Sequence, residues 1–255
     1  MQDLTLQERR NAILELLQEK GRVRVGDLSR YFGVSEVSIR ADLAELEEQE
    51  LLSRVHGGAV SSYRSYYNMS LAQRMKTNSA EKIAIAKKIA DLICDNETII
   101  MNAGTTLLYV LRELKDKRLT IVTNSIALAL EGAENKNFKV ILLGGDVDGA
   151  YQFTYGMKTL KLLEQYHADT FLLSVDGIDC EKGFSTFYYQ EAEICSKMAE
   201  RASKTIVAAD YTKIGRTAFA EIETIEPADI IVTNEKASPK YIKRLSEGRA
   251  EIILA

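Results

Sequence analysis

The pattern of apolar positions changes along the chain near residue 80. In the first sixty residues, apolar side chains recur at helical spacing in three short segments. From about residue 80 onward, short apolar runs alternate with amphipathic segments. The stretch between these two parts is rich in Ser and Tyr and has no sustained apolar period. This pattern predicts an N-terminal head (1–60), an ordered linker (61–79) and a larger body (80–255).

The head has the pattern of a helix-turn-helix followed by a small hairpin, which together predict a winged helix-turn-helix. Gly21 ends the first predicted helix, Gly33 permits a tight turn after the second, and Ser35 is a natural N-cap for the third. Residues 51–60 suit a hairpin, because a Gly-Gly pair permits the positive φ angles of its turn. The predicted inward positions are Ala12, Ile13, Leu16 and Leu17, then Val25, Leu28, Tyr31 and Phe32, then Ile39, Leu43 and Leu46.

The body alternates strands with helices. Near-continuous apolar strands separated by helices indicate an α/β fold, with a mostly parallel sheet covered by helices on both faces. The predicted strands are 98–102, 120–123, 139–143, 170–175, 205–209, 229–233 and 251–254. The predicted helices are 83–93, 106–114, 125–132, 160–166, 191–202 and 240–245.

Composition narrows the class of protein. Apolar residues make up 46% of the 255 positions and charged residues 27%, which is ordinary for a globular chain. No window approaches the roughly 18 apolar residues of a membrane span, and the N-terminus lacks a signal-peptide pattern. We therefore expect a cytoplasmic protein with no membrane partner. Three cysteines without a C-x-x-C pair and only two histidines predict free thiols and no metal site.

The third helix of the head is the predicted DNA-recognition helix. With its apolar stripe inward, Val37, Ala41 and Ala44 lie on the outer face, flanked by Ser38 and Arg40. Small apolar side chains on such a face suit thymine methyl groups in the major groove, and Arg40 can reach a guanine edge or a phosphate. The candidate DNA contacts are Arg22, Arg24, Ser35, Val37, Ser38, Arg40, Ala41, Arg54 and His56.

Charge alone does not mark the head as a nucleic-acid binder. Residues 1–60 carry eight Lys and Arg against eleven Asp and Glu, and the whole chain has a net charge of −4. However, phosphate contact depends on local charge within about 8 Å. Four acidic residues collect at the predicted far end of the third helix, away from the hairpin: Glu45, Glu47, Glu48 and Glu50. The alternative is a three-helix protein-interaction module with no role on DNA.

Polar residues follow successive strands of the body, where open α/β sheets bind ligands. Gly104, Thr105 and Thr106 open a helix whose free N–H groups suit a phosphate. Lys213 supplies a cation, and Asp176 and Glu191 supply acceptors for sugar hydroxyls. The candidate effector-binding residues are Gly104, Thr105, Thr106, Asn124, Ser125, Gly145, Asp176, Glu191 and Lys213. Taken singly, each of these residues also fits a structural role as a helix cap, a turn or a surface residue.

Three stretches of the head resemble the DeoR family of bacterial sugar-metabolism regulators. They are Glu8-Arg9-Arg10, Val34-Ser35-x-x-Ser38-Ile39-Arg40-x-Asp42-Leu43 and Arg54-Val55-His56-Gly57-Gly58-Ala59. The family usually has two consecutive arginines where this chain has Arg40-Ala41, which implies weaker backbone contact or a different operator.

The body is similar to the DeoR effector domain, which shares the ribose-5-phosphate isomerase-like fold. The matching positions are Gly104-Thr105-Thr106, Thr123-Asn124-Ser125, Gly144-Gly145, Asp176-Gly177-Ile178, Glu191-Ala192 and Asp210-x-x-Lys213. The resemblance implies binding of a phosphorylated sugar effector, a homodimer or homotetramer, and repression of a sugar-uptake or catabolic operon on double-stranded operator DNA. The sign of regulation is not readable from these residues, because activators use the same parts.

An isomerase is the rival interpretation of the body. Asp176-Gly177-Ile178-Asp179 resembles the Asp-Gly-Ala-Asp motif of ribose-5-phosphate isomerases, with Asp179 and Glu191 as acid and base. The Lys-Gly-Gly-Gly stretch that follows in those enzymes is absent, since residues 182–186 read Lys-Gly-Phe-Ser-Thr. A DNA-binding head also has no use in an isomerase. We therefore expect no catalytic residues and no cofactor.

Overall fold

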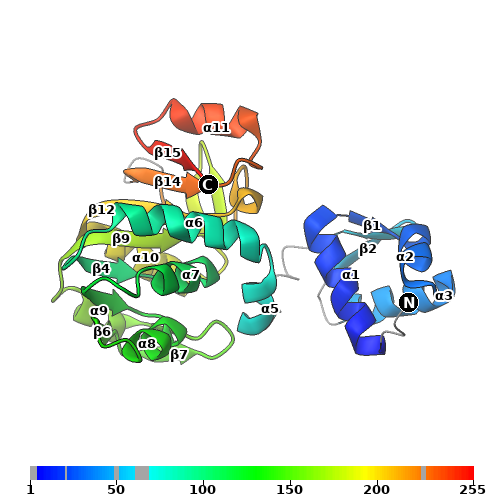
Figure 1. Ribbon diagram of the computed structural model, residues 1–255, viewed down its shortest axis with the longest axis horizontal. Helices are drawn as coiled ribbons and strands as arrows, with labels where there is room; N and C mark the ends of the chain where they lie inside the picture. The colour runs from blue at the N-terminus through cyan, green and yellow to red at the C-terminus, as the bar shows by residue number, and fades with distance from the viewer. Residues whose placement is uncertain (1–4, 21, 49–51, 61–68, 225–227) are drawn as a thin grey trace. The chain divides into compact units, whose positions relative to one another are not determined.

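The computed structural model describes residues 5–20, 22–48, 52–60, 69–224 and 228–255 (Figure 1). Its internal contacts divide the chain into two compact units, Met1–Asn78 and Ser79–Ala255. Within the described residues, no helix is long and apolar enough to cross a membrane. Gly21, Glu50, Leu51 and residues 61–68, which carry parts of the predicted helix end, acidic cluster, hairpin and linker, lie outside the described residues.

The described part of the first unit contains the predicted helices and hairpin. Its helices are α1 (Leu6–Lys20), α2 (Val25–Phe32), α3 (Glu36–Glu48) and, beyond the hairpin, α5 (Leu71–Lys76). Its strands are β1 (Arg22–Arg24), β2 (Ser53–Val55) and β3 (Gly58–Val60), which form an antiparallel sheet in the order β1-β3-β2. Strand β1 is a new element, since three residues carry too little pattern to predict it. Helix α5 lies in the predicted linker, where a capping box of Ser70 and Gln73 starts it.

The β2-β3 hairpin is the wing of the winged helix-turn-helix, and its two glycines have different roles. Gly57 turns the chain between β2 and β3 with a φ of +76°. Gly58 lies against β1, where a Cβ atom would fall 2.0 Å from the carbonyl oxygen of Val23. The Gly-Gly pair therefore serves both the turn and the close packing of the third strand.

Seven parallel strands form the main sheet of the second unit, in the order β15-β14-β12-β9-β4-β5-β6. All seven predicted strands are in this sheet, which confirms the α/β prediction. The central strands are mostly buried, as expected for a sheet with helices on both faces, while the two edge strands are partly exposed. The strands are β4 (Thr98–Met101), β5 (Leu119–Thr123), β6 (Phe138–Leu142), β9 (Ala168–Ser174), β12 (Ala202–Ala208), β14 (Ile230–Thr233) and β15 (Glu251–Leu254).

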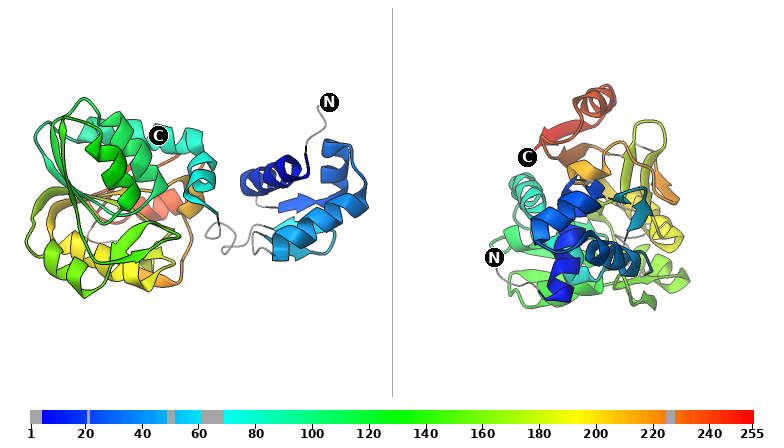
Figure 2. Two further views of the ribbon diagram at one scale, coloured as in Figure 1. Left: turned by 90° about the horizontal axis from the view of Figure 1, so that it is seen from below. Right: turned by 90° about the vertical axis from the view of Figure 1, so that its right-hand side faces the viewer.

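Two helical layers enclose this sheet. Figure 2 shows α6, α7 and α8 on one side of the strands and α10 on the other. The contacts agree, since α7 packs against α6 and α8, whereas α9 packs against α10. The helices are α6 (Ser79–Leu92), α7 (Thr105–Glu113), α8 (Ile126–Ala133), α9 (Met157–Leu163), α10 (Tyr189–Glu200) and α11 (Pro239–Ser246).

Short elements at the carboxyl ends of the parallel strands were not predicted. A hairpin of β7 (Asp146–Asp148) and β8 (Phe153–Tyr155) follows β6. A small antiparallel sheet joins β10 (Gly177–Asp179), β11 (Gly183–Thr186) and β13 (Ala220–Glu223). A 3-10 turn, η1 (Tyr211–Lys213), follows β12. These elements surround the edge of the sheet where the candidate effector residues lie.

Candidate functional site

Helix α3 presents the outer face that the sequence predicts. Val37 is 72% exposed and Ala41 is exposed as well, while Ala44 is half-buried. The three inward positions of α3 are fully buried in the head, namely Ile39, Leu43 and Leu46. An exposed Val beside an exposed Ala has no packing role within the described head, but it suits contact with thymine methyl groups.

The start of α3 is fixed by Ser35. The amide of Ser38 donates to Ser35 Oγ at 3.1 Å, which caps the helix as predicted. One turn later, Arg40 donates through a terminal guanidinium nitrogen to Glu36 Oε2 at 2.6 Å. Both side chains are about half exposed, so this ion pair is weak and can yield to a phosphate.

The wing arginine has an acidic neighbour that was predicted to lie elsewhere. Glu47 lies beside Arg54, because β2 returns alongside the end of α3. Glu47 accepts hydrogen bonds from the Arg54 amide at 2.8 Å and from Arg54 Nε at 2.6 Å. These two bonds hold the pKa of Glu47 below its ordinary value. The expectation that the acidic residues of α3 lie away from the hairpin is therefore wrong for Glu47.

The remaining basic candidates lie on different parts of the head. Arg22 and Arg24 are exposed on β1, which the central strand β3 separates from Arg54 on β2. They line a groove of about 300 Å³ together with Tyr31. Tyr31 is 65% exposed, so its predicted inward position is wrong. His56 is exposed in the turn between β2 and β3.

Asp42 stabilises the fold of the head and does not point to the predicted DNA-facing surface. Its side chain is only 2% exposed, and its two oxygens accept hydrogen bonds from Arg9 Nε at 2.7 Å and Arg10 Nε at 3.2 Å. This triad joins α1 to α3. The sequence motifs that resemble the DeoR family therefore include Arg9, Arg10 and Asp42, which support the recognition helix α3.

In the body, Asn102 and Glu191 form the floor of the candidate effector site. Asn102 follows β4 and is fully buried; it accepts a hydrogen bond from the Ser174 amide at 2.7 Å and donates to the Ser174 carbonyl at 2.9 Å. It also donates to Glu191 Oε1 at 3.3 Å. Glu191, on α10, is 4% exposed. Asn102 is the predicted end of a strand, but it is not among the predicted site residues.

Thr186 connects the two carboxylates of the site. Its Oγ1 lies 3.0 Å from both Asp176 Oδ2 and Glu191 Oε2. The other oxygen of Asp176 lies 3.7 Å from Lys213 Nζ. The structure thus brings together three predicted residues, Asp176, Glu191 and Lys213. Thr186 was missed because it lies on β11, whose residues show no strand pattern in the sequence.

The start of α7 borders this network. Gly104 precedes the helix and has no side chain to cap its first N–H groups. A Cβ atom at Gly104 would lie 2.4 Å from Ser174 Cβ on β9, so close packing requires glycine here. Thr105 and Thr106 are each 5% exposed in the first turn.

Asn124, Ser125 and Gly145 lie along the neighbouring strand ends. Ser125 caps α8 by accepting a hydrogen bond from the Leu128 amide at 3.3 Å. Asn124 Nδ2 donates to the Thr154 carbonyl at 3.2 Å. Its Oδ1 is buried and receives no hydrogen bond from the described residues. A Cβ atom at Gly145 would lie 2.0 Å from Thr159 Oγ1, which gives this glycine a packing reason as well.

The groups proposed for the rival isomerase are held in structural contacts. Asp179 Oδ1 accepts hydrogen bonds from the amides of Glu181 and Lys182 at 2.9 and 3.0 Å, which caps the turn after β10. Both oxygens of Glu191 accept hydrogen bonds inside the floor network. Among the described residues, no group of three His, Cys, Asp or Glu side chains is placed to hold a metal ion.

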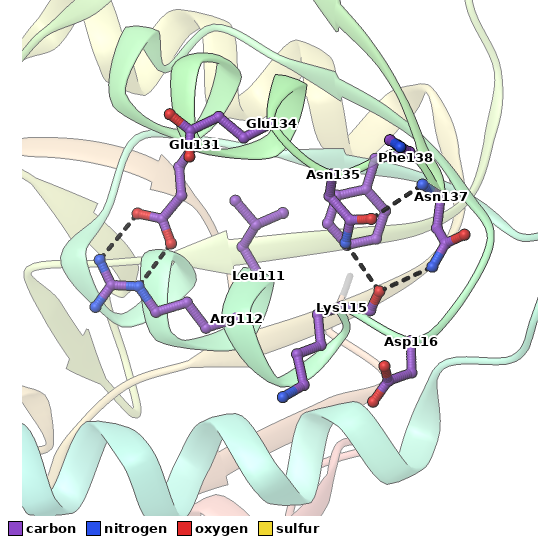
Figure 3. Close-up of a pocket in the computed structure, with 10 residues that line it drawn as sticks. Leu111, Arg112, Lys115, Asp116, Glu131, Glu134, Asn135, Asn137 and Phe138 are labelled. Atoms are coloured by element: carbon purple, nitrogen blue, oxygen red, sulfur yellow. Dashed lines mark hydrogen bonds and ion pairs between the residues drawn. The ribbon is translucent and has the colours of Figure 1, made fainter.

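A groove of about 660 Å³ lies at the opposite edge of the sheet, near the start of β6 and the ends of α7 and α8. Figure 3 shows Arg112 joined to Glu131 by two hydrogen bonds, while Asn135 and Asn137 both donate to the Lys115 carbonyl. None of the candidate effector residues lines this groove.

The chain combines a winged helix-turn-helix, whose recognition helix has an exposed apolar face, with an α/β domain whose strand ends are polar. This domain organisation is typical of a DNA-binding regulator with a separate sensor domain. The DeoR-like helix-turn-helix domain matches residues 9–64, and the DeoR C-terminal sensor domain matches residues 77–235. The chain belongs to the DeoR family, and the protein is a DNA-binding transcriptional regulator.

Relatives match this chain along nearly its full length. The HTH-type transcriptional regulator GolR of Listeria innocua is 36% identical over 97% of this chain and 98% of its own. The putative aga operon transcriptional repressor of Escherichia coli O157:H7 is 33% identical over 97% and 93%. The glycerol-3-phosphate regulon repressor of Escherichia coli K12 is 31% identical over 97% and 98%.

Solved structures give a weaker likeness. Ribose 5-phosphate isomerase A from Methanocaldococcus jannaschii aligns with a TM-score of 0.39 and 16% identity, over 54% of this chain and 55% of that chain. A likeness at this level supports no inference about activity.

Proposed function

We propose that the protein represses an operon for carbohydrate uptake or catabolism, and that a phosphorylated sugar or sugar derivative modulates its affinity for operator DNA. The names of two relatives, the aga operon repressor and the glycerol-3-phosphate regulon repressor, favour this class of target. The observation that carries the effector proposal is the buried network of Asp176, Thr186, Glu191 and Lys213 at the strand ends. A regulator that acts on DNA also favours the predicted cytoplasmic location.

On the DNA side, α3 enters the major groove with Val37, Ser38, Arg40 and Ala41 toward base edges. Ser35 supports its N-terminal end, and Arg54 and His56 of the wing contact the backbone. Arg22 and Arg24 extend the contact along β1. Because single heads have few cations, we propose that two heads of a homodimer or homotetramer bind half-sites about one helical turn apart.

On the effector side, the phosphate binds at the start of α7, near Gly104, Thr105 and Thr106, with Lys213 as its cation. Asp176 accepts hydrogen bonds from ligand hydroxyl groups, and Glu191 keeps Asn102 and Thr186 in place. Asn124, Ser125 and Gly145 complete the site, where the buried Asn124 Oδ1 has an open acceptor position among the described residues. The ligand changes operator affinity by binding more tightly to one arrangement of the heads.

A thermal-shift screen of sugar phosphates on the full chain tests this proposal, because a ligand that binds the folded state raises apparent stability. A compound that raises the melting temperature should also change the affinity for DNA upstream of the protein's own gene. If stabilising compounds leave DNA affinity unchanged, the sensor proposal is wrong. Turnover of a pentose or hexose phosphate by the purified protein would instead support the isomerase interpretation.

A further inference from the structure

Glu47 holds Arg54 through two different groups at once. Glu47 Oε1 accepts from the backbone amide of Arg54 at 2.8 Å, and Oε2 accepts from the side-chain Nε at 2.6 Å. One carboxylate therefore fixes both the backbone of β2 at Arg54 and the inner end of the guanidinium. The two terminal guanidinium nitrogens take no part in these two bonds.

The ion pair between Arg40 and Glu36 on α3 differs from that between Arg54 and Glu47 in the atoms that it joins. Arg40 reaches Glu36 through a terminal guanidinium nitrogen at 2.6 Å, one helical turn away. The Glu36 carboxylate contacts a terminal nitrogen of Arg40 and not its backbone amide, and both side chains are at least half exposed. The Glu36 carboxylate therefore neutralises a neighbouring arginine without holding its backbone, which makes Glu36 a control for Glu47.

Two physical effects of Glu47 on DNA binding have opposite signs. A carboxylate near the phosphate backbone repels it, so removing the carboxylate should strengthen binding. A carboxylate that holds a long arginine side chain in place lowers the conformational entropy lost on binding, so removing it should weaken binding. The double contact to amide and Nε makes the second effect the larger one at Glu47, whereas the first is the larger one at Glu36, because the Glu36 carboxylate occupies a terminal nitrogen of Arg40 that a phosphate would need.

We propose that Glu47 is a positioning residue for DNA binding, which presents the terminal nitrogens of Arg54 to the DNA backbone. This inference rests on the proposed contact between Arg54 and DNA. Its consequence is unusual for a DNA-binding head, since the loss of an acidic residue weakens binding.

Fluorescence anisotropy on the full chain tests the proposal, with a labelled duplex from the region upstream of the protein's own gene. The variants are Arg54→Ala, Glu47→Ala, Glu47→Gln and Glu36→Ala, each measured over a series of salt concentrations. Arg54→Ala should weaken binding and reduce the salt slope by about one, as expected for a lost phosphate contact. Glu47→Ala should weaken binding by about threefold or more with an unchanged salt slope, since the arginine charge is kept.

The controls separate positioning from charge. Glu47→Gln keeps a carbonyl acceptor without the charge, and its affinity should lie between those of Glu47→Ala and wild type. Glu36→Ala should bind as tightly as wild type or more tightly. If Glu47→Ala does not fold, Glu47→Gln decides the matter, because an affinity above wild type would show a charge effect alone.

Failure of this inference differs from failure of the proposed function. If the wild-type chain does not bind the duplex, or Arg54→Ala binds as well as wild type, the proposed DNA contact is wrong and the role of Glu47 is overturned with it. If Arg54→Ala weakens binding while Glu47→Ala equals or exceeds wild type, the wing contact stands and the positioning role is overturned.

Discussion

Lys213 Nζ lies 3.7 Å from Asp176 Oδ1 at the carboxyl edge of the body's sheet. Lys213, the only cation among the candidate effector residues, is therefore paired with Asp176, the carboxylate that is predicted to accept hydrogen bonds from sugar hydroxyl groups. In the proposed site, a phosphate that reaches Lys213 would compete with this carboxylate. The proposal therefore expects effector affinity to depend on the balance between an internal ion pair and a ligand contact.

Replacing Lys213 with Met should remove the proposed phosphate contact and keep the aliphatic stem of the side chain. A hydrogen bond to a charged group contributes about 1.5–3 kcal/mol, so we expect effector binding to weaken by about 10- to 100-fold. Calorimetric titration of the compound identified by thermal shift measures this change, and operator affinity without effector should stay at the wild-type level. Lys161→Met, at an exposed position on α9, is the control. Equal effector affinity in the Lys213 variant would mean that the site is misplaced.

Asp42→Asn should loosen the head without affecting the body. The substitution leaves Arg9 and Arg10 without their buried anion, and breaking such a buried pair costs about 3 kcal/mol. Hydrogen exchange on the full chain should show faster exchange in α1 and α3 and no change in β4 or β9. Asp27→Asn removes an exposed pair with Arg30 and should change stability by less than about 1 kcal/mol. Unchanged protection of α1 in the Asp42 variant would contradict the scaffold role.

Gly104→Ala should strain the contact between the start of α7 and the end of β9. The new Cβ would fall 2.4 Å from Ser174 Cβ, and overpacking of this kind costs about 1–3 kcal/mol. Ser174→Gly in the same chain should restore part of the stability, so denaturant unfolding of the double variant should show a favourable coupling. Gly149→Ala is the control, because a Cβ added there would meet no heavy atom of the described residues within 4 Å, apart from its chain neighbours. Additive effects of the two substitutions would argue against a direct clash.

Most of the main sheet was predictable because its central strands, such as β4, β5 and β14, are buried on both faces and therefore read as apolar runs, whereas the edge strands β6 and β15 are partly exposed. Ile99, Ile100 and Met101 of β4, for example, are all fully buried. The short strands β1, β10 and β11 mix polar and apolar residues over three or four positions, which gives neither an apolar run nor a visible period. Thr186 was missed for this reason, although it contacts both carboxylates of the site.

Contacts between elements were harder to predict than the elements themselves. The helical period correctly turned Ile39 inward and Val37 outward. It gave no information about the path of the chain after α3, which brings Arg54 back to Glu47. Helical spacing alone predicts that Tyr31 faces inward. In the structure, Val25 and Leu28 are the buried residues of α2, and Tyr31 lies at the surface.

Cys195 should make stability depend on pH in alkaline solution. Burial raises the pKa of its thiol well above the ordinary value of 9.0, and the Glu191 carboxylate raises it further. The folded state therefore keeps the proton to higher pH than the unfolded state does. Its contribution to stability is complete below pH 9.0 and falls as the pH rises above that value, by up to about 1.4 kcal/mol per pH unit.

Denaturant unfolding of wild type and Cys195→Ala at a series of alkaline pH values measures this contribution. The variant should lose less stability per pH unit above pH 9.0 than wild type. Cys94→Ala, at an exposed position, should follow wild type. Parallel curves for wild type and Cys195→Ala would show that the thiol does not titrate as inferred.

The central claim is that the exposed face of α3 enters DNA, and Val37→Glu tests it most directly. Val37 is 72% exposed, so the substitution should leave the fold intact while placing a carboxylate in the major groove. The measurement is the salt-dependent affinity of the full chain for the duplex upstream of its own gene, with Leu130→Glu, at a 68% exposed position in the body, as control. We expect salt-sensitive binding for wild type and Leu130→Glu and none for Val37→Glu. Equal binding by Val37→Glu would contradict the claim.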